Sequence, residues 1–333
     1  MNLFKSAKPK IIMYDKLAQE KYLPKWFPDT TKQVGNSYIK NLYKTISDLE
    51  QERLENDLSY TIEATKKNEK LNRYYDIVPY DFNRVVLNGT PDYINATHIS
   101  DMFGNEKYIA TQGPLPNTFY SFWQMVWEQK SPVVVMLTPE VEKDRIKCHK
   151  YWPETIDQPV EYSGEKSFSV VLKKDSSLMN GQTIHRQFEI EFEGSKRKVE
   201  QIQFLGWPDH EGSDAHLVLD VIDYANSVYS TATEMGPFIV HCSAGVGRSG
   251  TFCTIDSILK AFENGITDCS KLKKPDWDKV SNCDLVALSV NHLRHQRISM
   301  VQSFSQFKLC YEAILLRLHD WNDKGVSVTW NLE

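Results

Sequence analysis

One eleven-residue stretch, VHCSAGVGRSG at positions 240–250, limits the folds open to this chain more than any other. An apolar run of Phe238, Ile239 and Val240 leads into it and is typical of a buried strand. Beyond it, apolar residues recur at helical spacing, at Phe252, Ile255, Ile258, Leu259 and Phe262. The stretch is therefore predicted to be a tight loop between a strand and a helix, which indicates an α/β fold.

The composition of this loop favours anion binding. A loop that enters a helix N-terminus presents free backbone N–H groups and the positive end of the helix dipole, which together form a cradle for an anion. Three glycines, Gly245, Gly247 and Gly250, let the backbone turn tightly and approach a ligand closely. Arg248 adds a planar cation that can bind two oxygens of one phosphate.

Cys242 begins the loop, and the field that binds an anion also stabilises a thiolate. Cysteines in such places have pKa values of roughly 3.5–7.5, and a thiolate below a phosphorus atom is a ready nucleophile. Ser249 is placed to donate a hydrogen bond to the sulfur and so help it leave. The alternative is a buried structural cysteine near a surface arginine. The fixed spacing of histidine, cysteine, three glycines, arginine and serine favours the catalytic interpretation.

The stretch resembles the signature loop of the protein tyrosine phosphatases, which implies a general acid on a loop that closes over the site. The segment GWPDHEG resembles the family's acid loop and offers Asp209, about 33 residues before Cys242, with Trp207 as a hinge and Pro208 as a stiffener. Alone, a Trp-Pro-Asp triplet is more often a plain turn. The family usually continues with an aromatic residue, glycine, valine and proline, whereas this chain has His210, Glu211, Gly212 and Ser213.

Other segments match the family's motifs in order along the chain. NRYYDIVPYDFNRV resembles the tyrosine-recognition loop, which implies that Tyr74 stacks on the substrate ring and Asp76 binds the substrate backbone. KCHKYWP implies that Lys147 approaches the acid loop. VQSFSQF implies that Gln302 positions the hydrolytic water and that Gln306 supports it. The same resemblance implies that the phosphate binds to Ser243, Ala244, Gly245, Val246 and Gly247. It also implies that Arg294 and Arg297 support the loop that contains Gln302, which is called the Gln302 loop below.

The resemblance covers residues 68–318 and implies a single α/β domain with a highly twisted mixed β-sheet flanked by α-helices. We expect residues 66–320 to form this catalytic domain and residues 321–333 to form a tail. Residues 1–65 are expected to be an N-terminal extension with helical segments that dock on the domain. Their helical spacing is clearest at Ile39, Leu42, Tyr43, Ile46 and Leu49.

Two further local patterns predict individual elements. Mostly apolar residues occupy alternate positions from Ile184 to Phe192, and a second run of strand-forming residues extends from Val199 to Phe204. This pattern predicts a β-hairpin with its turn at residues 193–196. Apolar residues at helical spacing after residue 216 predict a helix, with Ser213 as its N-cap.

The resemblance implies a function: hydrolysis of phosphotyrosine in proteins through a phosphocysteine intermediate, in intracellular signalling. Cys242 attacks the phosphorus while Asp209 protonates the leaving phenolate, and Asp209 then activates a water held by Gln302.

Three alternative functions stay open. A catalytically dead phosphotyrosine-binding module would lack the cysteine, the arginine or the acid. A dual-specificity or lipid phosphatase would lack the Tyr74 segment, and a rhodanese-like or arsenate-reducing enzyme would have no use for the acid loop.

Composition limits the cofactors and partners. A net charge of −5 argues against non-specific nucleic-acid binding, and no apolar run approaches the roughly 20 residues of a membrane helix. The six cysteines include no CxxC pair or zinc-type cluster, which favours a reduced compartment, the cytoplasm or the nucleus, and implies no metal or other cofactor.

Expected partners are proteins that contain phosphotyrosine. The basic start, KSAKPKIIMY, resembles kinase docking motifs, so that a protein kinase is a second expected partner. The alternative for this segment is a disordered, solvated chain end.

Overall fold

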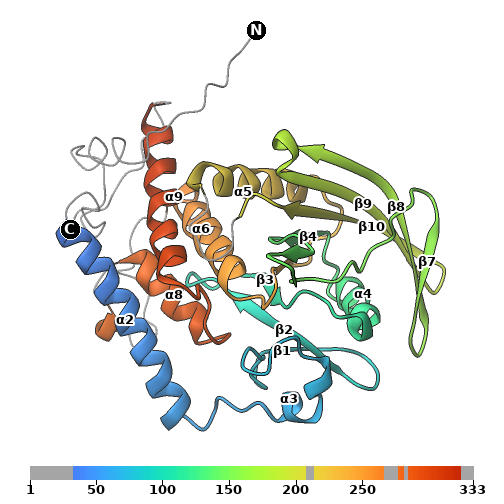
Figure 1. The fold of residues 1–333 in the computed structure, drawn as a ribbon, viewed down its shortest axis with the longest axis horizontal. Coiled ribbons are helices and arrows are strands. Elements are labelled where there is room, and N and C mark those ends of the chain that lie inside the picture. The colour runs from blue at the N-terminus through green and yellow to red at the C-terminus, as the bar shows by residue number, and fades with distance from the viewer. Residues whose placement is uncertain (1–32, 208–213, 266–276, 281–283, 324–333) are drawn as a thin grey trace.

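In the residues that the structure describes, nine strands form one large twisted sheet (Figure 1). The structure, a computed structural model, describes residues 33–207, 214–265, 277–280 and 284–323. The strands lie in the order β1-β2-β3-β11-β4-β10-β9-β8-β7. The four central strands, β3, β11, β4 and β10, run parallel, and the outer pairs are antiparallel. This arrangement confirms the predicted mixed sheet.

The elements of the described residues have the following bounds. The strands of the large sheet are β1 (Arg84–Val86), β2 (Tyr93–Ser100), β3 (Glu106–Thr111), β4 (Val133–Met136), β7 (Pro159–Ser163), β8 (Ser167–Leu178), β9 (Thr183–Phe192), β10 (Ser195–Phe204) and β11 (Phe238–His241). A separate two-stranded hairpin consists of β5 (Val141–Glu142) and β6 (Arg145–Ile146). The α-helices are α2 (Gln33–Asn56), α3 (Glu63–Lys67), α4 (Phe119–Glu128), α5 (Ala215–Ser230), α6 (Gly247–Glu263), α7 (Trp277–Val280), α8 (Leu285–Arg294) and α9 (Phe304–Asp323). Single 3₁₀ turns are η1 (Glu69–Leu71), η2 (Pro116–Thr118) and η3 (Met179–Gly181).

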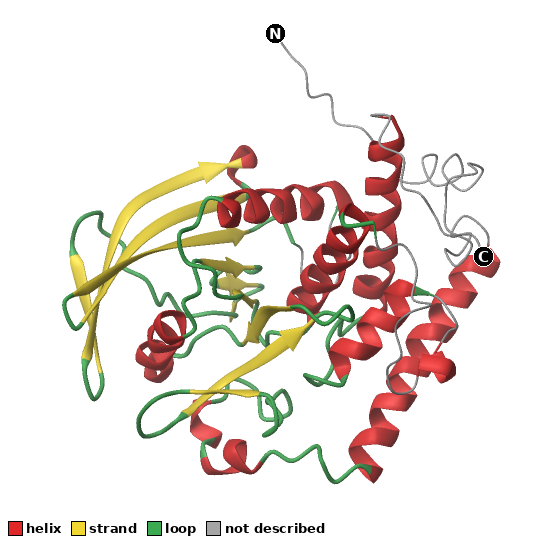
Figure 2. Cartoon of the chain, turned by 180° about the vertical axis from the view of Figure 1, so that it is seen from behind, coloured by secondary structure: helices red, strands yellow, loops and turns green. Residues whose placement is uncertain are grey.

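Each face of the sheet has its own hydrophobic core, because successive residues of a strand point to opposite faces. On β4, Val133 and Val135 belong to one core, while Val134 and Met136 belong to the other. Helices α5, α6, α8 and α9 cover the first face and α4 covers the second (Figure 2). Helix α2 packs against α8 and α9 and extends the first core with four buried residues at the predicted helical spacing, Ile39, Leu42, Ile46 and Leu49.

The predicted hairpin forms from β9 and β10. Its turn consists of Glu193 and Gly194, whose φ angles of 49° and 76° match the type I′ geometry that two-residue hairpins prefer. Strand pairing resumes at once, with Ser195 opposite Phe192. The turn is therefore two residues shorter than the predicted four.

Helix α5 begins one residue later than predicted. Asp214 is its N-cap, and the Asp214 carboxylate accepts a hydrogen bond of 3.0 Å from the His216 N–H. The predicted cap, Ser213, lies outside the described residues. Serine and aspartate are both good N-caps, so residue type alone does not choose between neighbours.

The predicted strand, loop and helix around Cys242 are β11, residues 242–246 and α6. Strand β11 lies between β3 and β4 in the parallel part of the sheet. Parallel strands end at the same edge of a sheet, which is where ligand sites of α/β folds form. The segments that follow β3, β4, β10 and β11 therefore meet at one edge, beside Cys242.

At the C-terminal end, α9 continues to Asp323, and Trp321 packs against the first core. Among the helices of the described residues, none is both long and apolar enough to cross a membrane.

Candidate active site

The loop after β11 turns its carbonyl oxygens away from Cys242. The His241 ring donates to the Cys242 carbonyl, and the Gly113 N–H donates to the Ser243 carbonyl at 2.9 Å. The carbonyls of Ala244 and Gly245 accept from Arg297, and that of Val246 accepts from the N–H groups of Gly250 and Val301. Every carbonyl of residues 242–246 is therefore engaged elsewhere, while the N–H groups of Gly245 and Ser249 lie next to the sulfur, as an anion cradle requires.

Arg297 serves this loop rather than the Gln302 loop, which corrects the prediction. Its guanidinium is fully buried and donates to the Ala244 carbonyl at 3.0 Å and the Gly245 carbonyl at 3.1 Å. Arg294 does serve the Gln302 loop, because it donates to the carbonyls of Met300 and Val301.

The three glycines of the loop are required for different reasons. Gly245 has a φ of 75°, and a Cβ there would lie 2.0 Å from the Thr111 carbonyl oxygen. A Cβ on Gly247 would lie 2.8 Å from the Gln306 side-chain nitrogen. A Cβ on Gly250 would lie 2.5 Å from the Val301 nitrogen. Gly250 is therefore needed for packing against residues 300–301, not for the close ligand approach that was predicted.

The environment of Cys242 lowers the pKa of its thiol. Burial alone would raise this pKa, but the Ser249 hydroxyl and N–H, the charge of Arg248 and the Gly245 N–H together outweigh it. The buried Ser249 hydroxyl makes no hydrogen bond of standard geometry within the described part of the chain, and of the groups near Cys242 it lowers the thiol pKa the most. The predicted role of Ser249 as a donor to the thiolate fits this arrangement.

His241 is a neutral, buried support for the loop. Its Nδ1 donates to the Cys242 carbonyl, so its Nε2 accepts from the Tyr151 hydroxyl at 2.9 Å. Tyr151 in turn accepts from Gln201 at 2.7 Å. Burial lowers the pKa of His241 to about 4, with the charge of Arg73 acting in the same direction. The ring thus keeps one tautomer and one orientation at neutral pH.

Arg248 is held in place by a carboxylate that the sequence analysis did not identify. Its Nη2 donates to both oxygens of Glu142, at 2.8 and 3.1 Å, and its Nη1 donates to the Leu137 carbonyl and the Thr138 hydroxyl. Lys147 lies 3.8 Å from the Glu142 carboxylate. The plane of the guanidinium is therefore set before any ligand binds, and Lys147 offsets part of the negative charge of Glu142.

Tyr74 lies beside the loop, as its predicted role requires. The Ser243 hydroxyl donates to the Lys147 carbonyl at 2.8 Å, so the Tyr74 hydroxyl is the donor in its own 2.8 Å bond to Ser243. The neighbouring Asp76 is exposed. Arg73 fixes the segment from behind, because it donates to the carbonyls of Gly113 and Pro114.

The two predicted glutamines occupy different positions. Gln302 has an exposed side chain, and its carbonyl accepts from the Tyr43 hydroxyl. The Gln306 carboxamide lies directly over Gly247 and accepts from the Ser303 N–H at 3.1 Å.

The acid-loop prediction falls mostly outside the described residues. Trp207 is buried at 2% exposure, and its ring lies 6.3 Å from that of Phe204. The remainder of the segment, Pro208 and Asp209 to Ser213, is outside the described residues.

Two further residues predicted to bind phosphate lie in the loop after β11. Ala244 is half-buried, and Val246 is the fully buried N-cap residue of α6.

Sequence reasoning missed Glu142 and Arg73 as site residues. Glu142 stands in β5, opposite Arg145 of β6, across a turn at Lys143 and Asp144 with φ angles of 49° and 58°. Lys-Asp is not a strong sequence signal for such a turn, so nothing local indicated that Glu142 would reach the site. Arg73 lies within the recognised NRYY motif, and that motif was the available signal.

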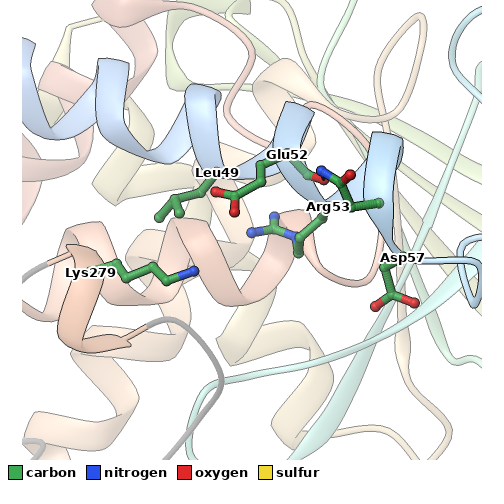
Figure 3. Close-up of a pocket in the computed structure, with 6 residues that line it drawn as sticks. Leu49, Glu52, Arg53, Asp57 and Lys279 are labelled. Carbon is green, nitrogen blue, oxygen red and sulfur yellow. Dashed lines mark hydrogen bonds between the residues drawn. The ribbon is translucent and has the colours of Figure 1, made fainter.

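A pocket between α2 and α7 is separate from this site (Figure 3). Its lining includes none of the predicted site residues and consists of Leu49, Glu52, Arg53, Asn56, Asp57 and Lys279.

In the described residues, no group of three or more histidine, cysteine, aspartate or glutamate side chains is arranged to hold a metal ion.

The environment of Cys242 leads to a prediction about its reactivity. The rate of alkylation by iodoacetamide, measured against pH, should reach half its maximum below the ordinary cysteine pKa of about 8.5. Ser249→Ala should move this midpoint upward, because the hydroxyl is the largest of the groups that lower the thiol pKa.

Ser243→Ala is the matched control and should leave the midpoint unchanged, since the Ser243 hydroxyl bonds to the Lys147 carbonyl instead. Burial raises the thiol pKa of Cys148, Cys253 and Cys310, so these should react last. An unchanged midpoint in Ser249→Ala would mean that Ser249 does not stabilise the thiolate.

Comparisons with known proteins agree with this geometry. The family model for protein-tyrosine phosphatase matches residues 68–316. Tyrosine-protein phosphatase non-receptor type 20 of Mus musculus is 36% identical over 280 residues, which are 83% of this chain and 59% of that protein. The protein-tyrosine-phosphatase PTP1 of Arabidopsis thaliana is 37% identical over 276 residues, which are 79% of this chain and 74% of that protein.

Solved structures show the same fold. The catalytic domain of human protein tyrosine phosphatase non-receptor type 18 superposes with a TM-score of 0.72 at 29% identity, covering 84% of this chain and 96% of that one. The chain thus spans most of a known catalytic domain but only 59% of the mouse type 20 relative. On the matched family model and on these relatives, the chain belongs to the protein-tyrosine phosphatase family.

Proposed function

We propose that this protein hydrolyses phosphotyrosine in proteins through a phosphocysteine intermediate. One observation carries the proposal: Cys242 begins a loop whose carbonyls bond to other groups, and the Ser249 hydroxyl and the charge of Arg248 favour its thiolate. A preorganised set of donors around a nucleophile is the arrangement that phosphoryl transfer needs.

In the first step, the loop N–H groups and Arg248 bind the phosphate oxygens, and the Cys242 thiolate attacks the phosphorus in line. The P–S bond forms as the P–O bond to the tyrosine breaks, and Asp209 gives its proton to the phenolate oxygen. Glu142 supports this step because it holds the Arg248 guanidinium in a fixed plane.

In the second step, the Asp209 carboxylate takes a proton from a water positioned by Gln302. The water oxygen attacks the phosphorus, the P–S bond breaks, and inorganic phosphate leaves with the Cys242 thiolate restored. Gln306 supports the same region, since its carboxamide lies over Gly247.

Tyrosine specificity is supported by the position of Tyr74. Its hydrogen bond to Ser243 places the aromatic ring at the edge of the loop, where it can stack on a phosphotyrosine ring. Asp76 is exposed next to it and is available to a peptide backbone. One solved relative, the type 18 phosphatase, is in complex with HER2 phosphopeptides, which is consistent with a protein substrate here.

Two wider proposals accompany this function. We assign α2 to the catalytic unit together with residues 66–320, because four of its side chains belong to the same core. We also place the protein in the cytoplasm or the nucleus, which imaging of the tagged full chain tests.

The function itself is tested with matched peptides. In the presence of a chelator, the protein should release phosphate from a phosphotyrosine peptide and not from the corresponding phosphoserine peptide. Cys242→Ser should abolish turnover and leave the fold intact, because a serine hydroxyl is not ionised at neutral pH. Comparable rates on both peptides would reject tyrosine specificity, and residual activity in Cys242→Ser would reject the nucleophile.

Asp209→Ala should convert the protein into a substrate trap. Turnover of a phosphotyrosine peptide should fall by about 10²–10⁴-fold, since the leaving phenolate loses its proton donor. Binding of the peptide should persist, because Arg248 and Tyr74 are unchanged. The wild type needs an ionised Cys242 and a protonated Asp209, so a plot of its turnover rate against pH should be bell-shaped. The plot for the variant should lack the fall in rate at alkaline pH. An unchanged bell would point to Glu211 or His210 as the acid.

The basic N-terminal segment is proposed to dock a protein kinase. Lys5, Lys8 and Lys10 precede Ile11 and Met13, and all of them lie outside the described residues. Deletion of residues 1–14 should leave peptide turnover unchanged and weaken binding to the partner kinase in a pull-down. If peptide turnover falls instead, the segment supports the catalytic domain and the docking proposal is wrong.

A further inference from the structure

Helix α2 lies outside the residues that the family model matches, yet it contacts the Gln302 loop directly. Tyr43 and Glu50 contact the loop itself, and Ser47, on the same stripe of α2, bonds to Arg294, which supports the loop. They are spaced four and three residues apart, so they lie on the same face of the helix. Figure 1 shows α2 running along the outside of α8, next to the helices that flank this loop.

The loop at residues 299–302 has a strained backbone. Ser299 and Val301 have φ angles of 57° and 58°, a region that non-glycine residues seldom occupy and that a β-branched residue such as valine avoids. Such conformations persist only where surrounding contacts hold them. The position of Gln302 therefore depends on what braces the loop.

Part of the brace comes from the catalytic domain itself. Arg294 donates to the carbonyls of Met300 and Val301, at 2.9 and 3.0 Å, and the Val301 N–H donates to the Val246 carbonyl at 3.1 Å. Helix α2 supplies the rest. One oxygen of Glu50 accepts from the Ser299 N–H at 2.8 Å, and the other lies 3.2 Å from Arg294 Nη1, which also donates to the Ser47 hydroxyl.

Tyr43 makes the contact closest to the reacting groups. Its hydroxyl donates to the Gln302 carbonyl at 2.5 Å. Its ring packs against Phe304 and Phe307, with centroid distances of 6.0 and 5.6 Å, and the Arg294 guanidinium lies 5.3 Å from its centroid. The ring is thus fixed by packing, and the hydroxyl adds a specific bond to the backbone of Gln302.

We propose that α2 is a positioning element for the hydrolysis step, and that Tyr43 is the positioning residue that sets the backbone of Gln302. The inference rests on the proposed function, in which Gln302 holds the attacking water. Formation of the phosphocysteine depends on Cys242, Arg248 and the Arg297-braced loop, none of which Tyr43 contacts through a hydrogen bond in the described residues. Loss of the Tyr43 hydroxyl should therefore slow the second step and spare the first.

Tyr43→Phe tests this in a stopped-flow experiment with p-nitrophenyl phosphate. The burst of p-nitrophenolate reports phosphocysteine formation, and the slower phase reports its hydrolysis. We expect an unchanged burst rate and a hydrolysis rate lower by about threefold to tenfold, the effect of one lost hydrogen bond. With ethylene glycol present, a larger share of the phosphoryl group should pass to the alcohol, because water is positioned less well. This partition reports the second step whichever step limits turnover.

Tyr38→Phe is the matched control, the same change on the same helix. The Tyr38 hydroxyl faces Asp284 at 3.4 Å rather than the Gln302 loop, so both rates and the partition should equal those of the wild type. Thermal unfolding should show that Tyr43→Phe is folded, since its ring contacts are kept.

Wild-type rates and partition in Tyr43→Phe would overturn the inference, as would a burst rate that falls together with the hydrolysis rate. Failure of the proposed function would look different. In that case the wild-type protein itself would release no p-nitrophenolate through Cys242, and no phosphocysteine could be trapped by rapid acid quench.

Discussion

The buried guanidinium of Arg297 holds the loop at residues 242–246 in the shape on which the rest of the candidate site depends. It donates to the carbonyls of Ala244 and Gly245 on one side and to Asn95 and Thr97 of β2 on the other. Burial lowers its pKa to about 10, although nearby groups that include Cys242 oppose this shift, so it stays a cation at neutral pH. A fixed positive charge thus lies behind the loop. It engages the Ala244 and Gly245 carbonyls, while the N–H groups of Gly245 and Ser249 and the charge of Arg248 act on Cys242.

The sheet explains how residues far apart in the chain converge on this loop. Strands β3, β11, β4 and β10 are parallel, so the segments after each of them emerge at one edge. After β3 comes Gly113, which bonds to Ser243, and after β4 come Leu137 and Thr138, which bond to Arg248. After β10 comes Trp207, at the start of the segment that carries Asp209. The topology therefore brings Cys242, its supporting groups and Trp207 to the same edge of the sheet.

Much of the surrounding structure serves to keep the site from relaxing. Ser299 and Val301 hold unfavourable backbone conformations, and Arg294 and Glu50 bond to the groups that these conformations expose. His241 stays neutral because burial lowers its pKa, and so it retains the tautomer that bonds to the Cys242 carbonyl. Glu142 fixes Arg248 ahead of ligand binding. Each device reduces the reorganisation that the site would otherwise undergo when an anion arrives.

The sequence by itself determined the elements whose signal is local. The strand, loop and helix around Cys242 and the hairpin of β9 and β10 follow from the spacing of adjacent residues, and the family follows from contiguous motifs. Only the tertiary structure decided the long-range contacts of the site. Glu142 pairs with Arg248, and Arg297 bonds to carbonyls of the loop at residues 242–246. Gly250 makes room for Val301, and the Tyr43 hydroxyl bonds to the Gln302 carbonyl. These partners are separated by about 50 to 260 positions, and no periodicity or spacing in one segment encodes a contact with another. Such contacts exist because the sheet and its helices bring the segments to one edge, where buried polar groups must find partners.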